Sequence, residues 1–482
     1  MKKWLILLFV VSLNARAIEI DPFRSTVNKP HQVKILNHGL ASLEERLQMI
    51  EKAKKSIDVE YFIYNLDKSG RIFSQALIKK AHEGIKVRML LDYFMVKSQF
   101  SPFFAHEMEK HGIEVKYFNT TSTLNLFSGQ YRNHRKVLLI DGLEAVTGGR
   151  NIGDEYFDLS EKFNFLDRDI KITGAIVEDI QETFNQVWDS KFSEKVDRQR
   201  EPKATDAFYS RTKGGNDLAR YRQDLKGWNK KITDAKEFLS VSNDSFVEVV
   251  RTKGKEELGK EYEGTCENMT YQSEYPIIGK KNRSERIIKY DLAERIKNAK
   301  ESIVFDSPYF IVDNQSKGAL ESALQNNVKV KLLTNSLNST DAIYVYTVFD
   351  TIIKKWINMG LETHIFKGEI PENYGSLTEE ISKARFGVHA KSFVFDNKDV
   401  IIGTYNFDPR SANFNTEMTV SCDNNPELAK IVLDDIDGRI KGSIHLDSDE
   451  TVDEAQFYNT GFMKRLSYYA FKIPSNLLDY LL

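Results

Sequence analysis

The sequence is poor in cysteine and has no long apolar run beyond its N-terminus. Cys266 and Cys422 are the only two cysteines among 482 residues, so at most one disulfide can form within the chain. Neither stands in a catalytic-looking context; they either pair in an oxidising compartment or stay separate buried thiols. Beyond the N-terminus no segment approaches the ~20 apolar residues of an ordinary spanning helix. No acidic cluster suggests a metal site, and we expect neither metal nor cofactor.

The chain also lacks an excess of positive charge. Its 68 Lys and Arg residues are balanced by 70 Asp and Glu, which gives a formal net charge of −2. Broad nucleic-acid binding depends on many Lys and Arg contacts to phosphate, so this balance argues against it, although it allows a local basic pocket. We therefore expect no nucleic-acid partner.

The N-terminus has the composition of a signal peptide. Met1-Lys2-Lys3 precedes about ten apolar residues, and the stretch ends in Ala15-Arg16-Ala17. Cleavage after Ala17 removes three basic residues and changes the net charge from −2 to −5. We predict a signal peptide at 1–17 and a protein exported across the inner membrane, periplasmic or membrane-associated. The alternative is an uncleaved N-terminal segment that anchors the protein.

Length and pattern favour an α/β protein of two or three domains, at ~100–200 residues for each domain. Helical spacing at 43–55, 69–83 and 104–111 alternates with strand-like runs at 56–64, 85–92 and 113–118. Such alternation is typical of parallel βαβ units. The predicted fold class is α/β, with a mixed sheet flanked by helices.

One short pattern, H-x-K-x4-D followed by a glycine turn that ends in asparagine, occurs twice. Its members are His134, Lys136, Asp141 and Asn151 in the first copy, and His389, Lys391, Asp396 and Asn406 in the second. All four positions repeat at one offset of 255 residues. A single copy would be weak evidence, because three fixed positions arise easily by chance. Two copies with the same tail at one offset indicate a shared function.

Local geometry explains this spacing. The runs 137–140 and 393–395 are β-branched and aromatic, so both are predicted strands. Residues i and i+2 of a strand face the same way, so the histidine and lysine of each copy project side by side. Asp141 and Asp396 stand at hairpin turns, where we expect a structural role. Each return strand brings its asparagine back beside the histidine.

The paired motifs resemble those of the phospholipase D superfamily. The tails 148–156 and 406–417 more narrowly resemble bacterial cardiolipin synthases of the type without paired N-terminal membrane spans. The resemblance implies two similar lobes packed with pseudo-twofold symmetry around one shared active site. Phosphoryl chemistry favours the same arrangement, because a nucleophile and an acid must face opposite sides of the phosphorus and each copy supplies one histidine.

The predicted site combines residues of both copies around a phosphodiester. One imidazole attacks phosphorus and forms a phosphohistidine, while the other protonates the leaving alkoxide and then activates the acceptor. The resemblance favours His134 as the nucleophile and His389 as the acid. Two lysines neutralise the phosphate oxygens and two asparagines donate hydrogen bonds to them: Lys136, Lys391, Asn151 and Asn406.

Each imidazole needs an acceptor that orients its second nitrogen. Glu417 and Asp167 both follow the glycine turns and precede predicted strands, so we assign them this role, with Asp169 as the alternative in the first copy. Tyr61 and Tyr309 end strands and either line the pocket or belong to the core. The sequence departs from the family at 344–346, where Tyr-Val-Tyr stands roughly where synthases usually carry a histidine; the identity of the acceptor stays open.

The repeat extends beyond the motifs, since segments such as 53–57 and 299–303 match at offsets that drift between 243 and 255. We predict a first lobe at 30–193, a linker with elaboration at 194–279 that contains one helix near 217–238, a second lobe at 280–456 and an amphipathic C-terminal segment at 457–482. That last segment either dips into a lipid interface or closes the domain core.

The resemblance implies a phosphatidyltransferase, similar to cardiolipin synthase, that transfers a phosphatidyl group to phosphatidylglycerol or a similar lipid alcohol. The alternatives are a phospholipase D with water as acceptor, an exported phosphodiesterase or nuclease, and a non-catalytic lipid-binding protein. We expect a phospholipid substrate and a membrane surface as partners, and infer no obligate protein partner.

Overall fold

The computed structural model describes residues 22–121, 130–206, 217–240, 244–275, 286–372 and 374–477. The predicted signal peptide at 1–17 lies outside these residues. Within the described ranges, no helix is both long enough and apolar enough to cross a bilayer.

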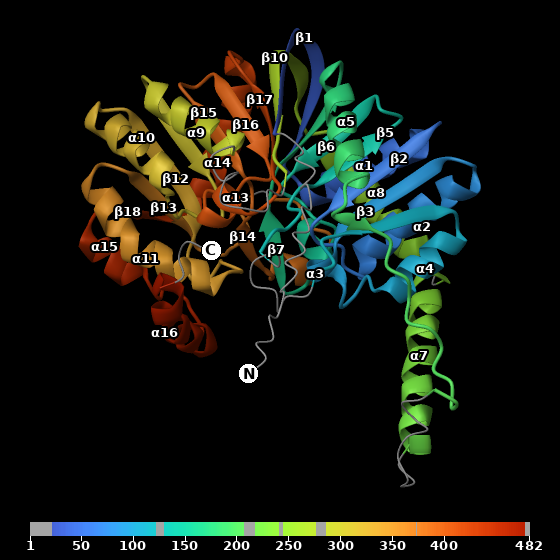
Figure 1. The fold of residues 1–482 in the computed structure, drawn as a ribbon. Coiled ribbons are helices and arrows are strands. Elements are labelled where there is room, and N and C mark those ends of the chain that lie inside the picture. The colour runs from blue at the N-terminus through green and yellow to red at the C-terminus, as the bar shows by residue number, and fades with distance from the viewer. Residues whose placement is uncertain are drawn as a thin grey trace, which may run out of the picture.

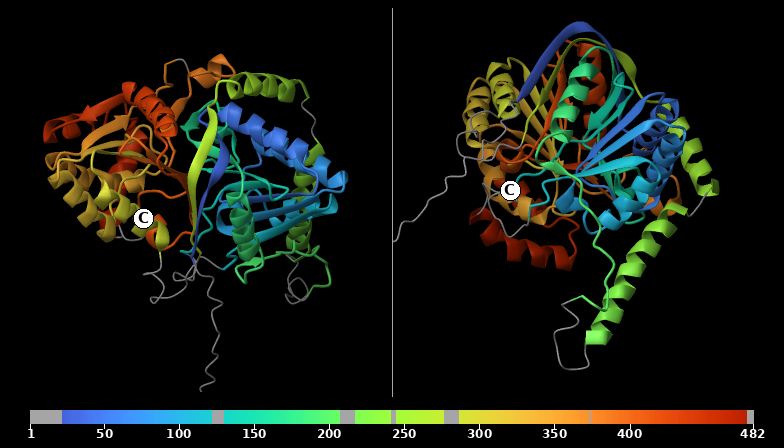
Figure 2. Two further views of the ribbon diagram at one scale, coloured as in Figure 1. Left: turned by 90° about the horizontal axis from the view of Figure 1, so that it is seen from above. Right: turned by 45° about the vertical axis from the view of Figure 1, so that its right-hand side comes forward.

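Two lobes with a similar order of elements lie side by side (Figures 1 and 2). The first contains α1 (Gly39–Lys52), β2 (Ser56–Tyr61), α2 (Lys68–His82), β3 (Lys86–Asp92), α3 (Tyr93–Val96), α4 (Pro102–Lys110), β4 (Ile113–Phe118), β5 (Val137–Ile140), β6 (Glu144–Gly148), β7 (Phe163–Leu166), β8 (Asp169–Thr173), α5 (Ile176–Trp188) and β9 (Ser193–Glu194). The second contains α9 (Ile287–Asn298), β11 (Ser302–Asp306), α10 (Asn314–Gln325), β12 (Lys329–Asn335), α11 (Ile343–Asn358), β13 (Glu362–Phe366), β14 (Arg385–Val388), β15 (Ser392–Phe395), β16 (Asp399–Gly403), α13 (Pro409–Asn413), β17 (Met418–Cys422), α14 (Pro426–Lys441) and β18 (Ser443–Leu446). The predicted α/β class with two similar lobes is confirmed.

One mixed sheet of 16 strands runs through both lobes in the order β18-β13-β12-β11-β15-β16-β17-β10-β1-β8-β6-β5-β2-β3-β4-β9. Its centre is the antiparallel pair β1 (Phe23–Leu36) and β10 (Glu263–Ser273). Outward from this pair, corresponding strands of the two lobes follow in the same sequence. Parallel pairing of β2, β3 and β4, and of β11, β12 and β13, forms the outer parts, as alternating strands and helices predict.

The central pair lies partly outside the predicted first lobe and partly inside the predicted linker. β1 begins at Phe23, before the predicted start of the first lobe, and β10 lies inside 194–279, which was assigned to a linker. The sequence of β1 did not indicate a strand because it contains Pro30, which cannot donate a hydrogen bond to a neighbouring strand. Pro30 stands where the register of the pairing shifts, between Asn28 and His31. Polar side chains buried in β10 hide its alternation. Long-range pairing, rather than local composition, makes these segments strands.

A disulfide ties this central pair to the second lobe. Cys266 of β10 and Cys422 of β17 are bonded, with Cα atoms 5.9 Å apart and a sequence separation of 156. The two strands also pair antiparallel. Of the two alternatives left open by the sequence, the structure shows the bonded pair.

Large apolar clusters fill both faces of the sheet. One lies under α1 and α2 in the first lobe, and another under α9, α10 and α11 in the second. A third lies under α5 and α14 and includes strands of both lobes. Because this third cluster includes residues of both lobes, the lobes share part of their core.

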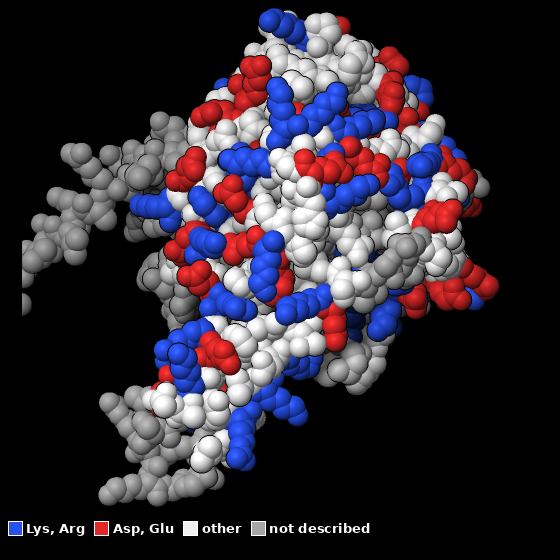
Figure 3. Space-filling model, turned by 90° about the vertical axis from the view of Figure 1, so that its right-hand side faces the viewer, with Lys and Arg blue, Asp and Glu red and all other residues white. Residues whose placement is uncertain are grey.

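Among the described residues between the lobes there are two helices, where one was predicted. α7 (Asp217–Ser240) projects from the body, as Figure 1 shows. α8 (Asp244–Leu258) packs on α1, where Arg251 forms ion pairs with Glu44 and Glu51. On the face seen in Figure 3, Lys and Arg side chains are interspersed with Asp and Glu over the body of the molecule.

Candidate active site

Four of the predicted catalytic residues line one pocket. His134 and Asn151 of the first lobe and His389 and Asn406 of the second face a hollow of about 390 Å³. Each histidine lies shortly before a hairpin strand, β5 or β15, and each asparagine lies shortly after the return strand, β6 or β16. The fold therefore brings the two motif copies together instead of leaving them on separate surfaces.

Two short stretches of parallel pairing cross between the lobes at this pocket. β14 of the second lobe pairs with β7 of the first, and these strands lead directly into His389 and Asp167. At the symmetric position, a parallel bridge joins the residues directly before His134 and Glu417. Each histidine is thus carried beside a carboxylate of the opposite lobe.

These carboxylates contact the imidazoles. His134 Nδ1 lies 2.9 Å from Glu417 Oε2, and His389 Nδ1 lies 2.6 Å from Asp167 Oδ2. The sequence indicated both carboxylates but not which histidine each would orient. A carboxylate at Nδ1 favours the tautomer with its proton on that nitrogen, so Nε2 keeps a lone pair for the pocket.

Glu417 is itself held by its neighbours. Its Oε2 accepts a hydrogen bond from Thr404 Oγ1 over 2.5 Å. Its Oε1 accepts from Ser411 Oγ over 2.7 Å and from Asn415 Nδ2 over 3.1 Å. These hydrogen bonds fix the orientation of the carboxylate, so that Oε2 faces the imidazole.

The glycine turn of the first copy is required by the carboxylate beside it. A Cβ on Gly149 would lie 2.0 Å from Asp167 Oδ1, closer than any side chain can come. Asp169, the alternative orienting residue, instead accepts hydrogen bonds from Ser42 and Arg46. The geometry places Asp167, and not Asp169, at an imidazole.

Each motif lysine lies behind its own histidine. Lys136 Nζ donates to the carbonyl oxygen of His134 over 2.7 Å, and Lys391 Nζ donates to that of His389. Both lysines are buried. An ammonium group has three donors, so this single bond does not exhaust its capacity to neutralise a phosphate.

The motif aspartates occupy the hairpin turns. Asp141 accepts hydrogen bonds from the backbone N–H groups of residues 54–56, and Asp396 accepts from those of residues 300–302. Both carboxylates tie a hairpin to the start of the neighbouring strand, β2 or β11. This is the structural position expected from their place in the turns.

Comparison with known proteins decides the family. A family model described as cardiolipin synthase, phospholipase D-like domain, matches residues 47–188 and 292–438, once in each lobe and over more than half of the chain. The chain belongs to this family. It is an enzyme of the phospholipase D superfamily, as its paired motifs predicted.

Relatives of this cardiolipin synthase family cover most of the chain. An uncharacterized protein of Helicobacter pylori (strain J99) is 30% identical over 453 residues, which are 89% of this chain and 85% of the relative. Cardiolipin synthase C of Escherichia coli K12 is 28% identical over 399 residues, 80% of this chain and 79% of the relative. Phosphatidylserine synthase of Haemophilus influenzae Rd KW20 is a solved structure of the same fold, with a TM-score of 0.63 at 14% identity over 94% of this chain and 98% of that one.

Burial sets the charge of the site in this family member. It lowers the pKa of His134 to about 4, against the opposing effect of Glu417. It also lowers the pKa of His389, and that of Lys391 to about 8. Burial acts to raise the pKa of Glu417, but His134 and Lys136 outweigh it and the pKa is lowered. Near neutral pH, neutral imidazoles therefore lie beside ionised carboxylates.

Sequence reasoning assigned no role to several other lining residues: Phe62, Phe94, Arg132, Asp408 and Arg410. Asp408 and the two arginines had a signal in the sequence. Arg132 stands two residues before His134 and faces the same side of an extended segment. Asp408 and Arg410 lie within the second motif tail. Alternation along the chain could have found the first arginine.

Tyr61 and Tyr309, for which the sequence left pocket and core positions open, lie in different environments. Tyr309 lines the pocket and donates to Asp341 over 3.0 Å. Tyr61 is fully buried, where its hydroxyl accepts from Arg46 over 3.1 Å. Tyr344 also lines the pocket, at the place where the sequence departs from the family pattern.

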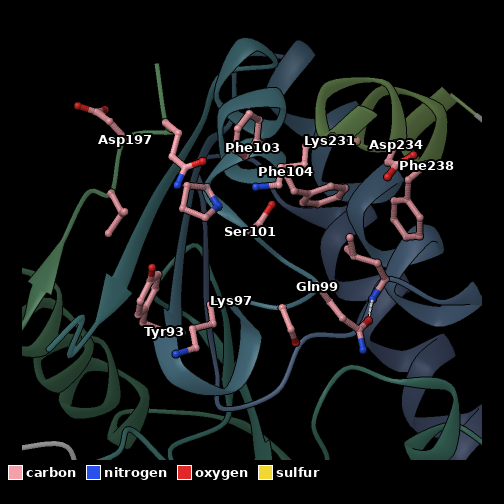
Figure 4. A pocket seen from close by; sticks show the side chains of 16 residues that line it. Tyr93, Lys97, Gln99, Ser101, Phe103, Phe104, Asp197, Lys231, Asp234 and Phe238 are labelled. Carbon is pink, nitrogen blue, oxygen red and sulfur yellow. Dashed lines mark hydrogen bonds between the residues drawn. The ribbon is translucent and has the colours of Figure 1, made fainter. Parts of the chain in front are cut away.

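A second, larger hollow of about 680 Å³ lies between α4 and α7 (Figure 4). Phe103, Phe104 and Phe238 line it together with Lys231 and Asp234. Neither motif histidine reaches it, so it takes no part in the chemistry derived below.

Proposed function

We propose that the protein is a phosphatidyltransferase that acts on phospholipid phosphodiesters through a phosphohistidine intermediate and forms cardiolipin or a similar lipid. The observation that carries the proposal is one pocket lined by two imidazoles, each oriented by a carboxylate of the other lobe. The relative named cardiolipin synthase C supports the same class of reaction.

In the first step, His134 Nε2 attacks phosphorus in line with the departing alkoxide. A P–N bond forms, the P–O bond breaks, and the alkoxide takes a proton from the His389 imidazolium. Burial disfavours that imidazolium and lowers the pKa of His389. The negative charge of a bound diester raises this pKa again, so that the protonated His389 can act as the acid. His134, with a pKa of about 4, is neutral at physiological pH, as a nucleophile must be.

In the second step, the hydroxyl oxygen of an acceptor attacks the phosphorus of the phosphohistidine. The neutral His389 takes the hydroxyl proton, the P–N bond breaks, and His134 regains its lone pair. The protein thus ends the cycle in its starting protonation state. Water in place of the acceptor would give phosphatidic acid.

Charge on the phosphate oxygens is balanced by the lysines and asparagines. Lys136 and Lys391 lie directly behind the imidazoles and neutralise negative charge as it develops. Asn151 Oδ1 accepts from the backbone N–H of Ile63 over 3.1 Å, which turns its Nδ2 toward the pocket, and Asn406 lines the same pocket. Preorganised donors of this kind are worth ~10²–10³ in rate each.

We also propose that α16 (Phe462–Leu477), at the lower left of Figure 1, rests on a lipid surface. Apolar side chains at helical spacing, 53–77% exposed, form its outer face: Phe462, Leu466, Tyr469, Ile473 and Leu477. Its inner face packs on α11 and buries Tyr468 completely. An apolar outer face reverses the usual pattern of a surface helix and fits one that lies at the headgroup boundary.

This helix lies beside the active site. The ring of Phe471 is 6.5 Å from that of Tyr344, which lines the pocket. Lys464 Nζ donates to three backbone carbonyl groups in the segment 337–340 and so fastens α16 to the loop after β12. A bilayer in contact with α16 would present headgroups to the pocket. From this surface and the predicted signal peptide we infer a periplasmic, membrane-associated protein.

Product analysis tests the reaction. The purified full-length protein is incubated with phosphatidylglycerol vesicles, with His134→Ala and His389→Ala as inactive controls. Cardiolipin together with glycerol supports transfer, whereas phosphatidic acid alone refutes it in favour of a phospholipase D. Cleavage of plasmid DNA without lipid turnover would favour a nuclease, and vesicle binding by a protein inert toward every diester would favour a lipid-binding role.

A further inference from the structure

Two arginines from opposite lobes line the active-site pocket, and none of the steps above uses them. Arg132, only 2% exposed, stands two residues before His134, and Arg410 stands four residues after Asn406. Asn133 forms a parallel bridge to the opposite lobe, so the segment is extended and Arg132 and His134 leave it on the same side.

The two guanidinium groups are close enough to influence each other. Burial lowers the pKa of Arg132, Asp92 opposes this effect, and the positive charge of Arg410 lowers it further. Arg132 Nη1 is 3.8 Å from Asp92 Oδ1, and Arg410 reaches across the lobe interface to Gln130 over 3.3 and 3.4 Å. Two like charges that line one pocket, one of them buried, repel each other, and an anion between them would remove that cost.

The pair breaks the symmetry of the site. At the offset of 255 residues that relates the motifs, Arg132 corresponds to Gly387 and Arg410 to Glu155. Glu155 Oε1 accepts from Asn65 Nδ2 over 3.0 Å, outside the lining of the pocket. Histidine, lysine and asparagine, in contrast, occur in both halves. Residues present twice serve the chemistry common to both steps, whereas a one-sided pair can tell one substrate from the other.

We propose that Arg132 and Arg410 form a second anion site, which binds the phosphate of an acceptor lipid and so selects an anionic glycerophospholipid over water or a neutral alcohol. This inference rests on the proposed transfer reaction. A guanidinium group matches phosphate with two parallel hydrogen bonds, and the scissile phosphate already has the histidines, lysines and asparagines around it.

The geometry suits an acceptor such as phosphatidylglycerol, whose free hydroxyl and phosphate lie at opposite ends of one glycerol unit. Residues i and i+2 of an extended segment are about 6–7 Å apart, the step from Arg132 to His134. A glycerol bridge with its two ester oxygens spans a comparable length. In the second step the acceptor phosphate rests on the arginines while its hydroxyl oxygen reaches phosphorus; the new P–O bond forms, the P–N bond breaks, and the proton passes to His389.

Soluble acceptors provide the test. The full-length protein acts on phosphatidylglycerol vesicles in the presence of labelled glycerol 3-phosphate or labelled glycerol, which differ by the phosphate alone. We expect the wild type to label lipid from glycerol 3-phosphate about tenfold better or more. Arg410→Gln and Arg132→Gln should abolish this preference and lower cardiolipin formation by a similar factor. Labelling from glycerol should change by less than about threefold.

Two variants act as controls. Arg410→Lys, which keeps the charge, should restore part of the preference. Asp341→Asn alters a charge in the same pocket and should not lower the preference. If thermal melting shows that Arg132→Gln, at a buried position, is not folded, Arg410→Gln alone tests the proposal.

The outcomes are distinct. A wild type that transfers lipid but shows no preference, or arginine variants in which all products fall in parallel, overturns the second anion site and leaves the transfer reaction standing. A wild type that forms phosphatidic acid alone, whatever the acceptor, refutes the transferase and the anion site together.

Discussion

Replacing Glu417 by glutamine should abolish nucleophilic attack by His134, although the two residues belong to different lobes. Glu417 Oε2 faces His134 Nδ1 at 2.9 Å, while Oε1 accepts from Ser411 and Asn415. A glutamine oxygen can keep the latter two bonds, but its NH₂ group then faces the imidazole. The proton of His134 is driven to Nε2, and the lone pair that should attack phosphorus is lost. A comparable tautomer change in a Ser-His-Asp triad costs ~10⁴ in kcat, or about 5 kcal/mol.

A chromogenic diester separates the two histidines. The p-nitrophenyl ester of phosphatidic acid has a leaving group that needs no proton, so formation of the phosphohistidine requires only the nucleophile. Glu417→Gln and His134→Ala should abolish the burst of nitrophenolate. Asp167→Asn and His389→Ala should keep it, yet fail with phosphatidylglycerol, whose alkoxide must be protonated. The opposite pattern would reverse the roles of the two histidines.

A double mutant tests the pairing between lobes. Because Glu417 acts through His134, the variant with both changes should be no slower than His134→Ala alone. Ser411→Ala removes a different hydrogen bond to the same carboxylate and should cost only about tenfold. Activity of Glu417→Gln within about tenfold of the wild type, in a protein of unchanged melting temperature, would refute the reasoning.

Three further predictions concern stability and membrane binding. Replacing Cys266 and Cys422 by serine opens a loop of 156 residues, and the chain-entropy model sets the loss in free energy of unfolding at up to about 5 kcal/mol; an unchanged urea midpoint would contradict it. The pKa of His134 is about 4 in the folded state against 6.5 when unfolded, so the unfolded chain binds more protons between these values. Stability should therefore fall as pH drops from 6.5 to 4, by on the order of 3 kcal/mol from this residue, and His134→Gln should flatten that part of the profile in denaturant titrations. Ile473→Ser, on the outer face of α16, should weaken sedimentation with anionic vesicles about tenfold, whereas Leu143→Ser, on the exposed hairpin between β5 and β6, should not; equal binding by both variants would contradict a membrane contact through α16.

The sequence by itself determined the local elements and the residues that bear the chemistry. Strands around both motifs follow from β-branched runs, and the side-by-side placement of histidine and lysine follows from the two-residue period of a strand. The duplicated spacing at one offset indicated a shared function, and the resemblance to the phospholipase D superfamily implied that the site acts on a phosphodiester. These features depend on neighbours in the chain, so a pattern of a few residues carries them.

Only the tertiary structure decided how the lobes complete each other. Glu417 reaches His134 across 283 residues, and Asp167 reaches His389 across 222. β1 and β10 became the centre of the sheet despite polar composition, because each finds its partner in the other lobe. Arg132 and Arg410 line one pocket for the same reason. Such contacts depend on which surfaces pack together, and no local period of the chain records that choice.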